Sequence, residues 1–170
     1  MRKIKKILLI VFTILALLAI VFFSFVFFSS DENLGYYLSN GRYTVSGYKA
    51  YPNESVPTKL TIPSMHNGIP ITKIDTEAFT NNSTIKEVVI SEGLENIGAC
   101  AFQNCVSLQC VTLPKSIKEI GPSAFRDCPN LDTVIFNGTV DEWNACEKGI
   151  MIFLYSYCTV YCVDGTVSYT

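Results

Sequence analysis

The stretch that decides the fold is Val111–Thr133, VTLPKSIKEIGPSAFRDCPNLDT, because it repeats the stretch before it. Laid without a gap over Val88–Cys110, VVISEGLENIGACAFQNCVSLQC, it is identical at seven of 23 positions. The dipeptide Ala-Phe marks the same period, since it occurs at 78–79, 101–102 and 124–125. Self-similarity at a fixed period of this length is typical of a solenoid, in which each repeat packs on its neighbours.

The repeat extends beyond these two units. Leu60–Glu87 is the same unit with five extra residues around Met65–Pro70, and Val134–Trp143 begins a fourth unit that then diverges. We therefore expect stacked 23-residue coils over residues 60–143, with Phe79, Phe102 and Phe125 forming one continuous spine.

Spacing within one unit predicts its local structure. The step of two from Val111 to Leu113 fits a strand, and the later steps of three and four up to Leu131 fit a short helical or 3₁₀ segment. Each coil is therefore expected to hold one strand, a turn and one helical segment, giving a mainly β fold with short helical turns. Pro63 and Pro114 are expected to end their strands, because proline cannot donate to a ladder.

Glycine and cysteine recur at fixed positions of the repeat. Gly98 and Gly121 follow an isoleucine, at a step where glycine would allow a positive φ at little cost. Cys105 and Cys128 share one repeat position, so they are expected to point inward as a ladder of buried free thiols. A disulfide between them is the alternative, since stacked strands lie about 4.8 Å apart.

These residues resemble the repeat of BspA-like, treponemal-type leucine-rich-repeat surface proteins. The pattern is carried by Leu113-Pro114, Ile117, Ile120-Gly121, Ala124-Phe125, Cys128, Leu131 and Val134. Three positions depart from it, where Asp75 replaces the glycine, Asn82 the cysteine and Ser91 the proline. The resemblance covers about residues 55–143, and Tyr157–Thr166 is similar to a terminal strand of bacterial members. It implies an exported or surface-attached binding protein without enzymatic activity.

Both ends of a solenoid need caps, since an open end exposes sheet edge and core. Tyr36–Val45 reads as two strands around Asn40-Gly41, a strong hairpin signal. We expect this hairpin, with a linker over 46–59, to form an N-terminal cap within residues 31–59. Residues 144–170 are expected to form the C-terminal cap, with strands in Phe153–Val163, while Trp143 covers the last repeat.

An apolar run precedes the repeats. Ile7–Phe28 carries no charge over 22 residues and as a helix would span about 33 Å, enough for a ~30 Å hydrocarbon core. Residues 1–6 carry four basic side chains, so the positive-inside rule predicts a cytoplasmic tail and an exported body. We expect a single-pass signal anchor in the cell membrane. Cleavage near Ser29 is the alternative, and would give a secreted protein.

Charge and composition argue against several function classes. The part after the basic tail carries 9 basic and 15 acidic groups, a net charge of −6, which does not suit nucleic-acid binding. The spacing Cys100-x₄-Cys105-x₄-Cys110 does not match zinc-ligand patterns, so no metal or other cofactor is expected. His66, the single histidine, reads as a solvated loop residue, and no nucleophile motif accompanies it.

The remaining cysteines lie near the C-terminus. Cys158 and Cys162 share one strand face, two alternations apart, which is too far for a comfortable bond between them. An oxidising exterior would allow a disulfide from either one to Cys146. Because the chain has seven cysteines, at least one stays unpaired within a monomer.

The strand residues that face outward are the candidate binding surface. Stacking the repeats aligns two rows on this surface, Thr61, Val89, Thr112 and Ile135, and beside them Lys59, Glu87, Cys110 and Thr133. A further row would hold Lys86, Gln109 and Asp132. Val89 and Ile135 are apolar where water is expected, which favours a binding partner. A solvated or protected sheet face without a partner is the alternative.

The leading hypothesis is a membrane-anchored, extracellular leucine-rich-repeat module for protein recognition or adhesion, without catalysis. A structural subunit of a cell-envelope assembly is the second hypothesis. An exported hydrolase that uses a cysteine or His66 is the third.

Overall fold

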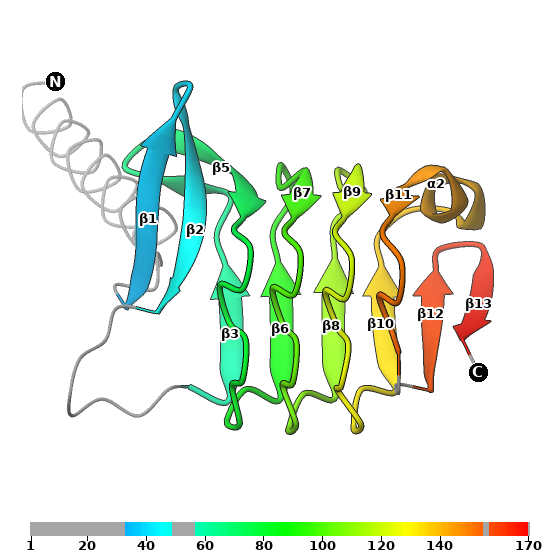
Figure 1. Cartoon of the computed structure of the whole chain (residues 1–170). Coiled ribbons are helices and arrows are strands. Elements are labelled where there is room, and N and C mark those ends of the chain that lie inside the picture. Colours follow the sequence, from blue (N-terminus) through cyan, green and yellow to red (C-terminus); the bar gives the residue numbers. More distant parts are fainter. Residues whose placement is uncertain (1–32, 49–56, 155–156, 170) are drawn as a thin grey trace, which may run out of the picture. The chain divides into compact units, whose positions relative to one another are not determined.

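The computed structural model describes residues 33–48, 57–154 and 157–169, which all lie in one compact unit, Asp31–Thr170. Two β-sheets run along this unit (Figure 1). The first, here called the ribbon sheet, contains in spatial order β13 (Gly165–Tyr169), β12 (Cys158–Cys162), β10 (Thr133–Phe136), β8 (Cys110–Leu113), β6 (Glu87–Ile90) and β3 (Lys59–Ile62). The second contains β1 (Leu34–Ser39), β2 (Arg42–Tyr48), β5 (Ile69–Ile74), β7 (Asn96–Ile97), β9 (Glu119–Ile120) and β11 (Glu147–Lys148), with β4 (Met65–His66) paired to β5.

The register of the ribbon sheet confirms the stacked coils. Val111 lies between Val88 and Val134 in a parallel ladder, so the steps from β6 to β8 and from β8 to β10 are each one 23-residue repeat. Inward and outward residues alternate along every strand, as β10 shows with Val134 and Phe136 buried. Strands β3 and β8 end directly before Pro63 and Pro114, as expected.

The second half of each coil differs from the sequence-based expectation. Instead of a helical segment it holds a two-residue strand of the second sheet, such as β7, followed by hydrogen-bonded turns. The physical reason is a left-handed backbone at repeating positions: φ is +54° at Cys100 and +57° at Asn104, and a helix cannot continue through such residues. Among the described residues the only helix is α2 (Val140–Ala145).

The repeated glycines serve close packing rather than a positive φ. Neither Gly98 nor Gly121 is among the positive-φ residues. A Cβ atom built on Gly98 would lie 2.5 Å from the carbonyl carbon of Asp75, and one on Gly121 would lie 2.6 Å from the nitrogen of Ala99. Glycine is needed because the backbone of the preceding coil passes too close for a side chain.

The phenylalanine spine is present and longer than expected. Ring centroids of Phe79, Phe102 and Phe125 lie 5.1 and 5.3 Å apart in stacked pairs, and Phe153 adds a fourth stacked ring at 5.7 Å. Tyr48 of the N-terminal hairpin closes the other end, 5.4 Å from Phe79.

The fourth coil is therefore complete, although its repeat was expected to diverge by residue 143. Helix α2 is inserted between β10 and β11, and its start is fixed by a capping box between Thr139 and Glu142. After the insertion the chain returns to register, since β11 pairs with β9 and Phe125 N donates to Ile152 O at 2.9 Å. The coil continues to Leu154, beyond residue 144, where the C-terminal cap was expected to begin.

The N-terminal hairpin is confirmed. Strands β1 and β2 pair antiparallel around Asn40-Gly41, whose φ values of +51° and +74° suit a type I′ turn.

The five-residue insertion forms a second hairpin of β4 and β5. His66 lies in β4 rather than in a solvated loop, which corrects that expectation: its ring stacks on Tyr36 at 4.1 Å and meets Tyr43 edge-on at 4.9 Å.

Trp143 closes the other end, as expected. It is fully buried, 5.3 Å from Phe136, and its Nε1 donates to the hydroxyl of Tyr169 in β13 at 3.1 Å. Lys148 Nζ lies 4.7 Å over the indole and donates to the carbonyl oxygens of Cys146 and Trp143.

The predicted membrane anchor, Ile7–Phe28, lies outside the described residues. Within the described part of the chain, no helix combines the length and apolarity needed to cross a membrane.

Candidate binding surface

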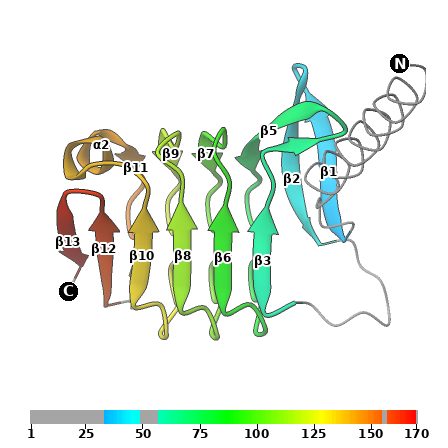
Figure 2. The same cartoon turned by 180° about the vertical axis from the view of Figure 1, so that it is seen from behind.

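The outward side of the ribbon sheet, here called the ribbon face, brings the predicted rows together. The ladder pairs Thr61 with Val89, and Thr112 with both Val89 and Ile135. The second row aligns in the same way, in the order Lys59, Glu87, Cys110 and Thr133. Both rows are therefore contiguous across four strands from four coils (Figures 1 and 2).

Exposure along the first row is uneven. Ile135 has 39% of its surface exposed, whereas Val89 and Thr112 are half-buried by their neighbours on the sheet. An isoleucine open to water in the middle of a sheet face is the least expected side chain of the row.

A strand within Phe153–Val163 was predicted as part of the C-terminal cap, but its place as the fifth strand of this surface was not. Thr159 pairs with Thr133, and Tyr161 pairs with Ile135, so both rows continue onto β12. Tyr161 is 48% exposed, and Tyr157 and Val163 at the ends of the strand are 80% and 71% exposed. The spacing from β10 to β12 is 26 residues, so the 23-residue period does not align these residues with the rows. The alternation from Tyr157 to Val163 was the available signal.

Charges flank the apolar row without crossing it. Lys59 Nζ lies 2.7 Å from Glu87 Oε1, and both side chains are exposed, so the pair adds little stability. Asp132 Oδ1 accepts a hydrogen bond from Thr133 Oγ1 at 2.7 Å. Burial, followed by the nearby carboxylates of Glu87 and Asp132, raises the pKa of the Cys110 thiol. Cys110 therefore stays protonated at neutral pH and is a poor nucleophile.

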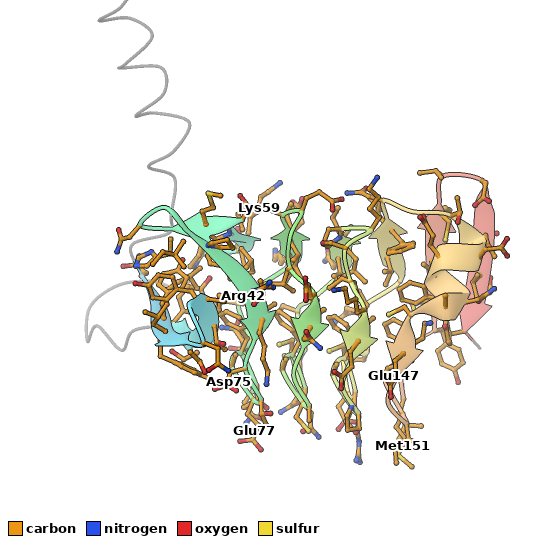
Figure 3. All side chains as sticks on the ribbon, turned by 90° about the horizontal axis from the view of Figure 1, so that it is seen from above. Arg42, Lys59, Asp75, Glu77, Glu147 and Met151 are labelled. Atoms are coloured by element: carbon orange, nitrogen blue, oxygen red, sulfur yellow. The ribbon has the colours of Figure 1, made fainter. Side chains whose placement is uncertain are left out.

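The second sheet presents a different outward surface. Its ladder carries Lys73, Asn96, Glu119 and Glu147 in successive strands. A shallow hollow of about 250 Å³ lies here between Lys73 and Glu119, below the roughly 300–1,000 Å³ of typical ligand pockets. In the view from above, Glu77 and Met151 lie along one edge of the unit and Lys59 lies on the other side (Figure 3). The ladder of the second sheet is thus polar and charged, whereas the ribbon face carries the apolar side chains Val89 and Ile135.

None of the seven cysteines, all of which lie in the described residues, forms a disulfide. Neither the Cys105–Cys128 disulfide nor one to Cys146 is therefore present. Cys105 and Cys128 are fully buried, and their Sγ atoms donate to the carbonyl oxygens of Phe79 at 3.3 Å and Phe102 at 3.1 Å. Burial raises the pKa of Cys158 to about 12.

The described residues include no group of three or more His, Cys, Asp or Glu side chains that could hold a metal ion. Asn82 stands at the cysteine position of the first coil but does not join Cys105 and Cys128 in the core. It is instead half-buried, and its Oδ1 accepts from the backbone nitrogens of Thr84 at 2.9 Å and Ile85 at 2.8 Å. Its side chain thus caps a turn.

Comparison with solved structures shows the same fold. A leucine-rich repeat protein of Treponema pallidum has a TM-score of 0.60 and 20% identity, over 74% of this chain and 66% of its own. One of Bacteroides capillosus has a TM-score of 0.61 and 24% identity, over 76% and 94%. A leucine-rich cell surface protein of Faecalibacterium prausnitzii has a TM-score of 0.54 and 24% identity, over 78% and 42%. The chain thus spans less than two thirds of the Treponema and Faecalibacterium proteins.

No curated protein matches this chain. The family described as "BspA type Leucine rich repeat region" matches residues 46–146 in six copies, more than half of the sequence. This match agrees with the resemblance found in the repeat itself and with the stacking of the coils. The chain belongs to the BspA-type leucine-rich repeat family.

Proposed function

We propose that this chain is a membrane-tethered, outward-facing module that recognises a protein through the ribbon face and carries out no catalysis. The fold is suited to protein–protein interaction, because stacked repeats build an extended and rigid surface. The observation that carries the proposal is the row through Val89 and Ile135, which continues into Tyr161 on β12.

The physical reason is the free energy of covering apolar side chains. Fully burying a Val or Ile side chain stabilises a complex by about 1.5–3 kcal/mol, and the half-exposed side chains here would each contribute a part of that. Tyrosine adds a large contact area with a polar end, which is why it is enriched at interfaces. Lys59 and Asp132 would then form the polar rim.

The location is proposed from the sequence of the N-terminus. The basic tail, residues 1–6, and the uncharged Ile7–Phe28 favour a signal anchor with the repeats outside the cell. The Faecalibacterium relative is described as a cell surface protein, and the proposal gives this chain the same location. Protease added to intact cells should remove the repeats and leave the tail. Protection of the repeats would contradict this orientation.

The binding test uses the full chain with Val89→Glu and Ile135→Glu together. The matched control is Val106→Glu with Ile150→Glu, which places the same two changes on exposed residues outside the ribbon face. Crosslinking on cells should recover a protein partner with the wild-type chain and the control, and at least tenfold less with the ribbon variant. Equal recovery with both double variants would refute the proposal.

The same experiment separates the alternatives. A structural subunit of an envelope assembly would be found with one fixed neighbour that survives the ribbon substitutions. An exported hydrolase would show one hyper-reactive thiol towards an activity probe.

A further inference from the structure

The two ends of the ribbon sheet differ in how their edges are protected. Strands β3 and β13 are the terminal strands of the sheet, so each has one hydrogen-bonded neighbour. Alternate residues of an edge strand direct their N–H and C=O groups away from that neighbour. Within the described residues, β13 is paired only with β12, and no described element lies beyond it at this end (Figures 1 and 2).

Other edges carry the devices that prevent strands from pairing with another chain. Strand β3 is flanked by Pro57 and Pro63 and carries Lys59. On the second sheet, β1 has a register shift between Gly35 and Tyr36, and β11 is only two residues long. Charged residues, proline, bulges and short strands are the usual protections of an edge.

Strand β13 has none of these. Its sequence Gly-Thr-Val-Ser-Tyr carries no charge and no proline, and its pairing with β12 runs unbroken from Gly165 to Tyr169. Val167 and Tyr169 pack on the core but stay only partly buried. An edge strand that is five residues long, regular and uncharged is a ready template for another strand.

We propose that β13 pairs antiparallel with β13 of a second copy of this chain, about a two-fold axis at Val167. In this register Gly165 of one copy faces Tyr169 of the other, Thr166 faces Ser168, and Val167 faces itself. The large ring thus lies opposite the residue without a side chain, and hydroxyl side chains meet hydroxyl side chains. No like charges come together, and two-fold contacts of this kind are the commonest in homo-oligomers.

A second copy fits this edge better than a foreign strand. Strand β13 carries no charge that would select a different sequence, while its own sequence is complementary to itself in antiparallel orientation. Pairing would join two ribbon sheets of six strands into one of twelve, since each copy contributes its whole sheet. The ribbon face would then be presented twice on one surface.

The test is intermolecular crosslinking of the full chain carrying Val167→Cys. Opposed Cα atoms in an antiparallel pair lie about 4.5–5.5 Å apart, within the ~4.4–6.8 Å that a disulfide spans. Asn144→Cys, on an exposed position of α2, is the matched control, and the wild-type chain reports the background from native thiols. A second arm adds Ser168→Lys to Val167→Cys, with Ser83→Lys as its exposed control away from the edge.

Val167→Cys is expected to give a covalent dimer of two identical chains at least tenfold faster than Asn144→Cys. Ser168→Lys should slow this at least tenfold, and Ser83→Lys should leave it unchanged. Equal rates for the two cysteine variants, no effect of Ser168→Lys, or a covalent link to a different protein would each overturn the proposal. Val89→Glu with Ile135→Glu should not change dimer formation, so this result is independent of the function proposed for the ribbon face.

Discussion

The central ring of the spine gives the sharpest test of how the coils hold together. Phe102 is fully buried and stacks on Phe79 on one side and on Phe125 on the other. Replacing it with alanine removes the ring and leaves a cavity that the closely stacked coils cannot fill. Substitutions of this kind cost about 3–5 kcal/mol of unfolding free energy. The substitution also removes two ring pairs, worth about 0.5–1.5 kcal/mol each, so we expect the loss for Phe102→Ala to lie near the upper end of this range.

The assay is urea unfolding of residues 31–170, followed by two signals. Far-ultraviolet circular dichroism reports the whole unit, and the fluorescence of Trp143, the single tryptophan, reports the last coil. We expect both midpoints to fall together, because the core is one continuous cluster from Leu34 to Val160. Val106→Ala, on an exposed turn, should change the free energy of unfolding by less than about 0.5 kcal/mol. A loss below about 1 kcal/mol for Phe102→Ala, or an unchanged Trp143 midpoint, would refute the cooperative spine.

Two further predictions concern backbone spacing and thiol chemistry. Gly98→Ala should lower the free energy of unfolding by about 1–3 kcal/mol through overpacking, because the new Cβ would meet the backbone of Asp75. Gly68→Ala should lower it by only about 1–2 kcal/mol, because its Cβ meets no atom within 4 Å and the cost comes from the positive φ alone. Urea unfolding measures both changes. The pKa of Cys110 is raised by burial and by the carboxylate of Glu87, so less of the thiol is ionised at a given pH. Its alkylation should lag behind that of a free cysteine at pH 8 and approach it only in more alkaline solution, and Glu87→Gln should speed it; a rate that matches free cysteine at pH 8 would contradict this reasoning.

Much of the fold could be predicted because the repeat has a constant step. Residues that are 23 apart, such as Phe102 and Phe125, occupy the same place in successive coils. The period therefore predicts both the inward ladder and the ribbon rows. The turn of the N-terminal hairpin was also predictable, because Asn40 and Gly41 tolerate the positive φ that a type I′ turn requires.

The parts that could not be predicted depend on contacts between residues whose separation in the sequence differs from 23. Phe153 lies 28 residues after Phe125, since α2 is inserted between them, so a search at the constant period leaves it out. Tyr161 was missed for the same reason. His66 sits next to Asn67-Gly68 in a polar segment, and only the folding of β4 beside the N-terminal hairpin brings its ring onto Tyr36.

By itself, the sequence determined the period, the inward residues, the hairpin and the strand ends, because each of these follows from spacing or from the backbone preference of one residue. The tertiary structure alone decided the second sheet, the role of Gly98, the completion of the fourth coil and the unprotected edge at β13. These features arise where one stretch of backbone meets another, and the distance between two backbones is set by packing rather than by either stretch alone.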